Sequence, residues 1–207
     1  MRADSPGARG DTADELGRSV TLEAILLALA LAAPQPWAPP GRAEPEDRRA
    51  ERLGWIAGAA ADAAESPDAA GWPWTSRDLA VLALVVTWYE SGRWSARVHA
   101  APWTPDVRGT RATCLGQLHA TTWVPYAEWR TLAGADADAT RRCLGATVRV
   151  LARHAARCRV GQAPTEWQIA RVVHAYGTGS CARSPARWAR GRAWVWRRWL
   201  RDAERRE

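Results

Sequence analysis

Glu90 is the residue whose type and position most directly suggest chemistry. It ends an apolar run over residues 79–89, and on a helix it would share the stripe that faces the interior. Trp88, Tyr89 and Trp94 are its aromatic neighbours in the sequence. Burial and the C-terminal end of the helix dipole both disfavour the ionised form of a carboxyl group. A carboxyl group that keeps its proton near neutral pH can act as a general acid, so Glu90 is the candidate catalytic residue.

Two further short motifs follow Glu90 in the chain. Residues 114–118 read Cys-Leu-Gly-Gln-Leu, and residues 175–179 read Ala-Tyr-Gly-Thr-Gly. The first motif is typical of a turn, and the second falls at the end of an expected helix. Tyr176, like Glu90, is a polar group at the last inward position of its helix.

In order and spacing, these three motifs resemble the soluble lytic transglycosylase domain of the lysozyme-like superfamily. That family carries Glu-Ser with an aromatic residue shortly after, then a Gly-Leu-Met-Gln-like turn, then Ala-Tyr-Asn-x-Gly. The likeness covers about residues 48 to 178. The chain departs from the family pattern at Cys114, Gly116 and Gly177, where the family usually has Gly, Met and Asn.

The resemblance implies a cell-wall lytic enzyme acting on peptidoglycan glycan strands. Glu90 would protonate the glycosidic oxygen between N-acetylmuramic acid and N-acetylglucosamine and then act as the base. The acetamido group of the sugar would assist, and the muramyl 6-hydroxyl would attack, leaving a 1,6-anhydro product. No cofactor is expected. The implied location is extracytoplasmic (periplasm, cell envelope or secreted) or phage-associated.

The resemblance also implies roles for residues around Glu90. Ser91 would support the helix end or contact substrate, Gln117 would lie in the cleft, and the hydroxyl of Tyr176 would lie near the carboxyl group of Glu90. The complete set of supporting or substrate-binding residues is Ser91, Trp94, Leu115, Gly116, Gln117 and Tyr176.

Other readings of the same residues stay open. A second carboxylate would favour lysozyme-type hydrolysis with water, and Asp106 is the best candidate, although an Asp after Pro105 is also typical of a turn. Glu90 could instead be a structural acid paired with Arg93 or another arginine. Tyr176 could be a core tyrosine. A catalytically silent protein that binds glycan in an envelope or virion structure is therefore an alternative.

Composition narrows the partners without choosing among them. The chain has 207 residues, 47% hydrophobic residues and a net charge of +7, which favour a globular protein and anionic partners. All 29 basic residues are arginine, which indicates a coding bias, so no single arginine is evidence of function. The 14 tryptophans can fill a core or line a groove. Arg and Trp could bind nucleic acid, but no reader motif supports this.

The expected fold is all-α, with a small irregular or β-hairpin insertion. Helical spacing and capping signals predict helices over about 46–65, 75–90, 138–157, 165–177 and 185–204, with a shorter one starting near Thr122. Residues 99–113 are too rich in Pro, Gly and Thr for a helix. The last helix carries Arg and Trp, and either packs on the core or contacts an anionic envelope surface.

An N-terminal extension over residues 1–45 precedes the expected catalytic domain over residues 46–207. The extension holds an apolar segment over 19–33 and a Pro-rich linker over 34–41. The apolar segment is too short for a confident membrane span, and acidic residues precede it, which is unusual for a signal peptide. A buried or amphipathic helix is the favoured interpretation, and a secretion signal is the alternative.

The cysteines and histidines do not form a recognisable metal site. No Cys-x-x-Cys spacing occurs, and the four histidines show no ligand spacing, so no metal is expected. Cys143 and Cys158 lie on one expected helix, roughly 22 Å apart, and cannot pair with each other. Cys143 opens that helix and Cys181 follows the end of the next one, so we predict that Cys143 and Cys181 are the closest pair.

Overall fold

The computed structural model describes residues 21–34, 43–100, 104–105, 111–161 and 163–206. Most of these residues are helical, and the predicted all-α class is confirmed. In chain order the elements are α1 (Leu22–Ala32), α2 (Glu46–Glu65), the 3₁₀ turn η1 (Pro67–Ala69), α3 (Ser76–Glu90), α4 (Ala96–Ala100), β1 (Thr104–Pro105), β2 (Arg111–Ala112), α5 (Tyr126–Trp129), α6 (Ala137–Arg157), α7 (Glu166–Thr178) and α8 (Arg187–Glu204).

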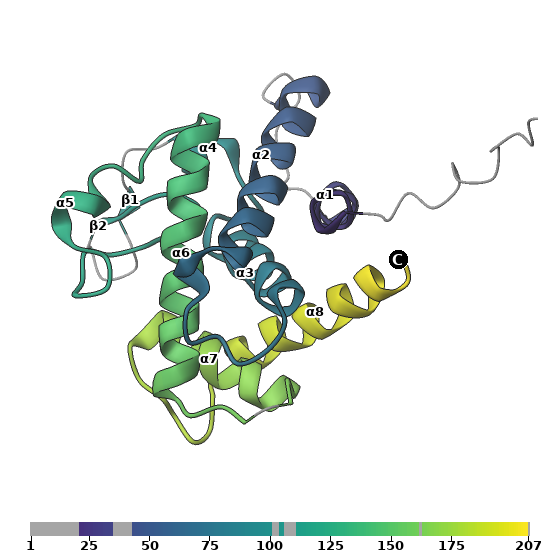
Figure 1. The fold of residues 1–207 in the computed structure, drawn as a ribbon. Helices are drawn as coiled ribbons and strands as arrows, with labels where there is room; N and C mark the ends of the chain where they lie inside the picture. The colour runs from purple at the N-terminus through teal and green to yellow at the C-terminus, as the bar shows by residue number, and fades with distance from the viewer. Residues whose placement is uncertain (1–20, 35–42, 101–103, 106–110, 162, 207) are drawn as a thin grey trace, which may run out of the picture.

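Helix α3 is the centre of the core. Thr75 and Asp78 form a reciprocal capping box at its start, as the sequence predicts. Its residues from Leu79 to Val86 are all fully buried, so the helix is apolar on every side. Helices α2, α6 and α8 pack against it, and they enclose it on several faces (Figure 1).

Helix α1 belongs to the same core. Its residues Ile25, Leu26 and Leu29 are buried, and α1 contacts α2, α3 and α8. The apolar segment of the N-terminal extension is therefore a packed helix of 11 residues. Within the described ranges, no helix is both long enough and apolar enough to cross a membrane.

The predicted irregular insertion contains a minimal hairpin. Strands β1 and β2 pair antiparallel, with Thr104 opposite Ala112, and an isolated bridge joins Thr113 to Leu118. These strands and α5 lie together on one side of α6 (Figure 1). The helix expected from Thr122 is shorter than predicted, because only Tyr126–Trp129 is helical and Pro125 precedes it as the N-cap.

The end of α7 also differs by two residues from the expectation. Gly177 is still helical, and the chain leaves the helix at Gly179, whose φ of 72° is the left-handed conformation that glycine adopts without strain. Gly177 has no positive φ value, and its lack of a side chain has a different cause, which is packing. A Cβ atom there would lie 2.7 Å from Cη2 of Trp188 on α8, so the ring of Trp188 occupies the space that a side chain at this position would need.

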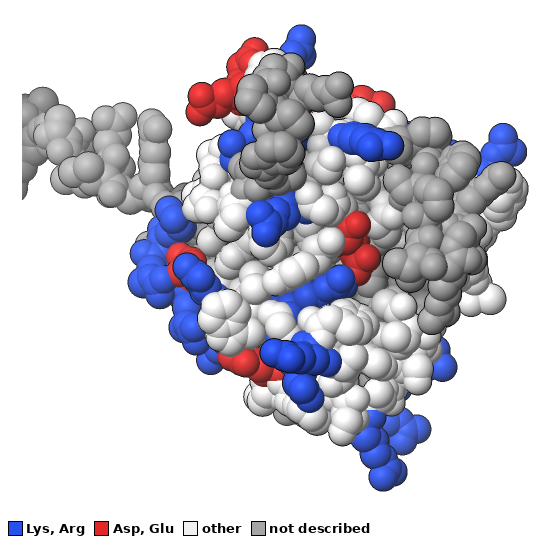
Figure 2. Space-filling model, turned by 180° about the vertical axis from the view of Figure 1, so that it is seen from behind, with Lys and Arg blue, Asp and Glu red and all other residues white. Residues whose placement is uncertain are grey.

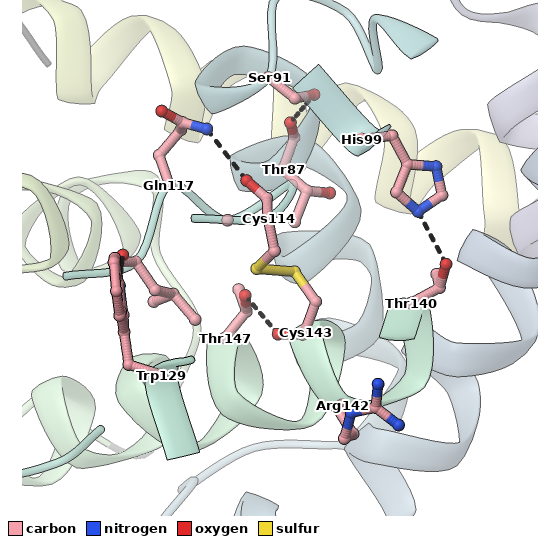
Figure 3. Close-up of a disulfide and its surroundings, with 12 residues drawn as sticks. Thr87, Ser91, His99, Cys114, Gln117, Trp129, Thr140, Arg142, Cys143 and Thr147 are labelled. Carbon is pink, nitrogen blue, oxygen red and sulfur yellow. Dashed lines mark hydrogen bonds between the residues drawn. A yellow bond between two sulfur atoms is a disulfide. The ribbon is translucent and has the colours of Figure 1, made fainter. Parts of the chain in front are cut away.

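The prediction that Cys143 and Cys181 form the closest pair is wrong. Cys143 is bonded to Cys114, and Cys158 is bonded to Cys181. The prediction assumed that α6 and α7 pack antiparallel, which would bring the C-terminal end of α7 to the start of α6. The end that it meets is the C-terminal end of α6, because Cys181 lies 5.3 Å from Cys158 between Cα atoms. The start of α6 instead meets the turn that carries Cys114 (Figure 3).

Helix α8 packs its tryptophans on the core, as one of the two readings of this helix predicts. Trp196 is fully buried and donates its indole N–H to the carbonyl oxygen of Asp78 at 3.0 Å. Trp199 is also buried and lies 6.0 Å from the ring of Trp94 between centroids. The other two tryptophans of α8 are exposed, Trp188 to 40% and Trp194 to 52%.

A buried histidine makes the stability of this core depend on pH. Nε2 of His99 lies 2.7 Å from the hydroxyl oxygen of Thr140 (Figure 3), and that hydroxyl donates to the carbonyl oxygen of Asp136. The histidine therefore acts as the donor to Thr140. Burial, followed by the positive charge of Arg52, lowers the pKa of His99 from 6.5 to about 4.

We therefore expect the protein to lose stability as the pH falls from 6.5 towards 4. In that window His99 takes up a proton in the unfolded chain and stays neutral in the folded one, so protonation favours unfolding. His99 contributes about 2 kcal/mol to this loss between pH 7 and pH 5, and His154, whose pKa burial also lowers to about 4, adds to it in the same window. Urea unfolding at both pH values measures it. The variant His99→Gln cannot titrate and should show a smaller pH slope; an unchanged slope in that variant would contradict the assignment.

Candidate functional site

The end of α3 is a tight turn that fixes where Glu90 lies. The hydroxyl of Ser91 donates to the carbonyl oxygen of Thr87 at 2.6 Å and accepts the backbone N–H of Trp94 at 2.9 Å. Gly92, Arg93 and Trp94 all have positive φ values, between 53° and 66°. For a non-glycine residue this conformation costs of order 1 kcal/mol, and the complete burial of the Trp94 ring offsets it.

This turn decides between the roles expected for Ser91 and Trp94. Both residues are fully buried, and the indole N–H of Trp94 donates to the hydroxyl of Thr87 at 3.1 Å. Neither side chain can touch a substrate without local unfolding. Ser91 therefore supports the helix end, which is one of its two expected roles. Trp94 was expected to support the site or contact substrate, and the structure places it in the core, away from any substrate.

Glu90 itself is held by an arginine of α8. Its carboxylate forms an ion pair with the guanidinium of Arg192, and the two side chains are 22% and 16% exposed. The guanidinium also lies between two aromatic rings, 4.7 Å from the centroid of Trp188 and 5.1 Å from that of Tyr89. The sequence left open a structural acid paired with Arg93 or another arginine, and this ion pair is such an arrangement.

Tyr176 connects α7 to the turn at 114–118. Its hydroxyl donates to the carbonyl oxygen of Gly116 at 2.6 Å. The approach requires glycine at that position, because a Cβ atom on Gly116 would lie 3.0 Å from the Tyr176 hydroxyl and 2.3 Å from the hydroxyl of Thr147. This contact explains why position 116 carries no side chain.

The phenol of Tyr176 remains protonated at all ordinary pH values. Burial, followed by the negative charge of Glu90, raises its pKa far above the usual 10. The hydroxyl of Tyr176 bonds to Gly116 and the carboxylate of Glu90 bonds to Arg192, so the expected direct approach of these two groups stays a prediction.

The turn at 114–118 is held from three sides. The disulfide ties Cys114 to the start of α6, and the bridge between Thr113 and Leu118 closes the turn at its base. The side-chain amide of Gln117 donates to the carbonyl oxygen of Cys114 at 3.0 Å (Figure 3). Leu115 is fully buried, so it supports the turn by packing in the core. It is not accessible to a substrate.

A cleft of about 790 Å³ opens beside this turn. Residues after the turn, α5, the C-terminal half of α6 and the C-terminal end of α7 form its walls. Of the described residues, the lining includes Gln117 and Tyr176, as expected, but does not include Glu90. Its aromatic and imidazole groups are His119, Trp123, Tyr126, Trp129, His154 and Tyr176.

Aromatic rings line one wall of this cleft. Tyr126 and Trp129 stack with centroids 5.7 Å apart, and Tyr126 is 62% exposed. Trp123 lies edge-on to the imidazole of His154, with centroids 4.5 Å apart. Burial, followed by the positive charge of Arg157, lowers the pKa of His154 to about 4, so this imidazole is neutral near pH 7. Flat rings and neutral polar groups are typical of sites for uncharged ligands such as sugars.

Sequence reasoning did not identify the wall residues or Arg192. Trp123, Tyr126 and Trp129 form a Trp-x-x-Tyr-x-x-Trp run whose spacing could have indicated one exposed aromatic face. Arg192 gave no signal, because it is one of 29 basic residues and lies 102 positions from Glu90. Asp106, the candidate second carboxylate, lies outside the described residues.

Comparison of the chain with family models, with curated proteins and with solved structures finds no match. Among the described residues, no group of three or more His, Cys, Asp or Glu side chains is arranged to hold a metal ion.

Proposed function

We propose that this protein is a lysozyme-like, peptidoglycan-cleaving lytic transglycosylase in which Glu90 is the single general acid and base. The observation that supports the proposal is the hydrogen bond from Tyr176 to Gly116, beside the cleft that Gln117 and Tyr176 line. It joins the second and third motifs of the resemblance. Chance likeness of short motifs would not require these two to meet in space.

The proposed reaction needs a single carboxyl group and consumes no water. Protonated Glu90 would donate its proton to the glycosidic oxygen as the bond to the muramyl carbon breaks. The acetamido oxygen of the same sugar would stabilise that carbon. Glu90, now ionised, would then accept the proton of the muramyl 6-hydroxyl as this oxygen closes the 1,6-anhydro ring. Substrate-assisted schemes of this kind are established exceptions to the two-carboxylate rule.

The ion pair with Arg192 must open before this chemistry can start. An ionised carboxylate accepts hydrogen bonds only, so Glu90 cannot donate a proton while it is paired as an anion. Opening is feasible because Arg192 is itself partly exposed and lies close to Tyr89 and Trp188, two rings that solvent reaches. We propose that a bound glycan displaces the guanidinium from the carboxylate.

The same ion pair favours a second candidate function, a catalytically silent glycan-binding protein. In that case the pair is permanent and structural, and only the aromatic cleft acts. Lysozyme-type hydrolysis is a third outcome if Asp106 supplies a second carboxylate. Two disulfides form most readily in an oxidising environment, which supports the proposal of an extracytoplasmic or phage-associated location.

Analysis of the products from purified peptidoglycan separates these functions. A lytic transglycosylase releases muropeptides that end in 1,6-anhydro-muramic acid, each lighter than the hydrolysed product by one water molecule. We expect mass spectrometry of the digest to show the anhydro ends. Reducing ends would assign hydrolysis instead. Binding to the glycan without any released fragment would assign the silent protein.

A further inference from the structure

The solvent face of α8 carries a continuous basic stripe. We use this name for Arg187, Arg190, Trp194, Arg198, Arg201 and Arg205. These residues follow one another at intervals of three or four along the helix, so they project from the same face. All six are exposed. The helix spans about 27 Å, so the stripe is a straight, convex ridge.

The opposite face of α8 is buried against the rest of the protein. Ala189, Ala193, Trp196 and Leu200 are buried in the hydrophobic core. The helix therefore cannot turn its apolar side to a partner without unfolding the protein. Any partner of α8 must contact the stripe with the helix in place.

Little negative charge balances the stripe. Among the described residues, no acidic side chain forms an ion pair with Arg187, Arg198 or Arg201, while Arg205 is paired with Asp202 on the flank of the stripe. Basic side chains gather on the edge of the molecule where the C-terminal part of α8 lies (Figure 2). The resulting field attracts an extended anionic surface.

One aromatic residue marks the centre of the stripe. Trp194 is 52% exposed and lies between Arg190 and Arg198. An exposed indole among arginines is costly in water, because its apolar ring remains hydrated. Tryptophan is favoured at the boundary between lipid head groups and acyl chains, where its ring is buried and its N–H stays hydrated.

We propose that the basic stripe of α8 docks the protein on a bilayer that contains anionic lipids. A straight convex ridge matches a flat surface, and each arginine near an anionic leaflet contributes attraction that salt weakens. Trp194 would enter the head-group layer between the arginines. Single-stranded nucleic acid is a poorer fit, because its binding sites combine a basic groove with several stacking rings. The proposal does not depend on the enzymatic activity of the cleft.

Sedimentation of the full-length protein with vesicles tests this docking. We expect binding to vesicles of phosphatidylcholine with phosphatidylglycerol, no binding to phosphatidylcholine alone, and release at high ionic strength. The double variant Arg198→Ala and Arg201→Ala should bind about thirtyfold more weakly. Trp194→Ala should also weaken binding but keep its salt dependence. Circular dichroism and thiol titration check that each variant is folded and oxidised.

The matched control removes the same charge elsewhere. Arg141 and Arg153 are exposed on α6, outside the stripe, and replacing both with Ala lowers the net charge equally. This control should bind within about threefold of the unaltered chain. Equal losses in both double variants, or no binding to anionic vesicles, would overturn the proposal. So would binding of an oligonucleotide, but not of vesicles, through Arg198 and Arg201, since that would assign a nucleic-acid site.

Discussion

Replacing Glu90 with Gln is expected to lower peptidoglycan cleavage by about a thousandfold, to the limit of detection. Gln cannot donate or accept the proton that the proposed reaction moves, and general acid–base catalysis contributes about 10² to 10⁴ in rate. The assay is the release of soluble muropeptides from purified sacculi. The variant is isosteric, so it should keep the turn at the end of α3 and the packing of Trp94.

The ion pair between Glu90 and Arg192 affects the stability of this variant, and it also provides a control variant. Glu90→Gln leaves the guanidinium of Arg192 without its anionic partner, which costs about 1 to 3 kcal/mol for a half-buried group. Arg192→Gln breaks the same ion pair and keeps the carboxyl group. If Glu90 is the general acid, the Arg192 variant retains activity or gains it, while the Glu90 variant has none.

A structural acid predicts a different pattern. The two variants would then lose similar stability, and any activity would follow only the folded fraction of each. Urea unfolding of both variants supplies that fraction. Equal activities per folded molecule would refute the catalytic role of Glu90 and favour the silent glycan-binding protein.

Removing the Cys114–Cys143 disulfide is expected to lower the free energy of unfolding by about 3.5 kcal/mol. The bridge closes a loop with a sequence separation of 29, and the loss of this constraint on the unfolded chain accounts for that value. The double variant Cys114→Ala and Cys143→Ala avoids free thiols. Urea or guanidinium unfolding measures the loss.

The second disulfide is a close control for this effect. Cys158 and Cys181 are separated by 23 positions, so the variant with both replaced by Ala should lose nearly the same stability. Only the first bridge anchors the turn that carries Gln117, so only its removal should lower cleavage per folded molecule. A loss below about 1 kcal/mol, or four reactive thiols in the denatured wild-type chain, would contradict the assigned bridges.

The helices and their caps were predictable because they depend on local interactions. The capping boxes at Thr75 and Thr165 are present as expected, and the helices over 46–65 and 76–90 begin and end within a residue of their predicted limits. Apolar periodicity and caps act within four residues, so the sequence displays them directly. The disulfide pairing was predicted wrongly because it depends on residues far apart in the chain, as with Cys114 and Cys143, which are separated by 29 positions.

The sequence by itself determined the all-α class, the helix ends that carry Glu90 and Tyr176, and the turn that carries Gln117. Only the tertiary structure decided that Cys114 and Cys143 pair, that Trp94 and Leu115 are core residues, and that Arg192 holds Glu90. The physical reason is distance along the chain. Partners separated by 29 to 102 positions meet only when whole helices pack, and the order of residues does not specify which helix ends will meet.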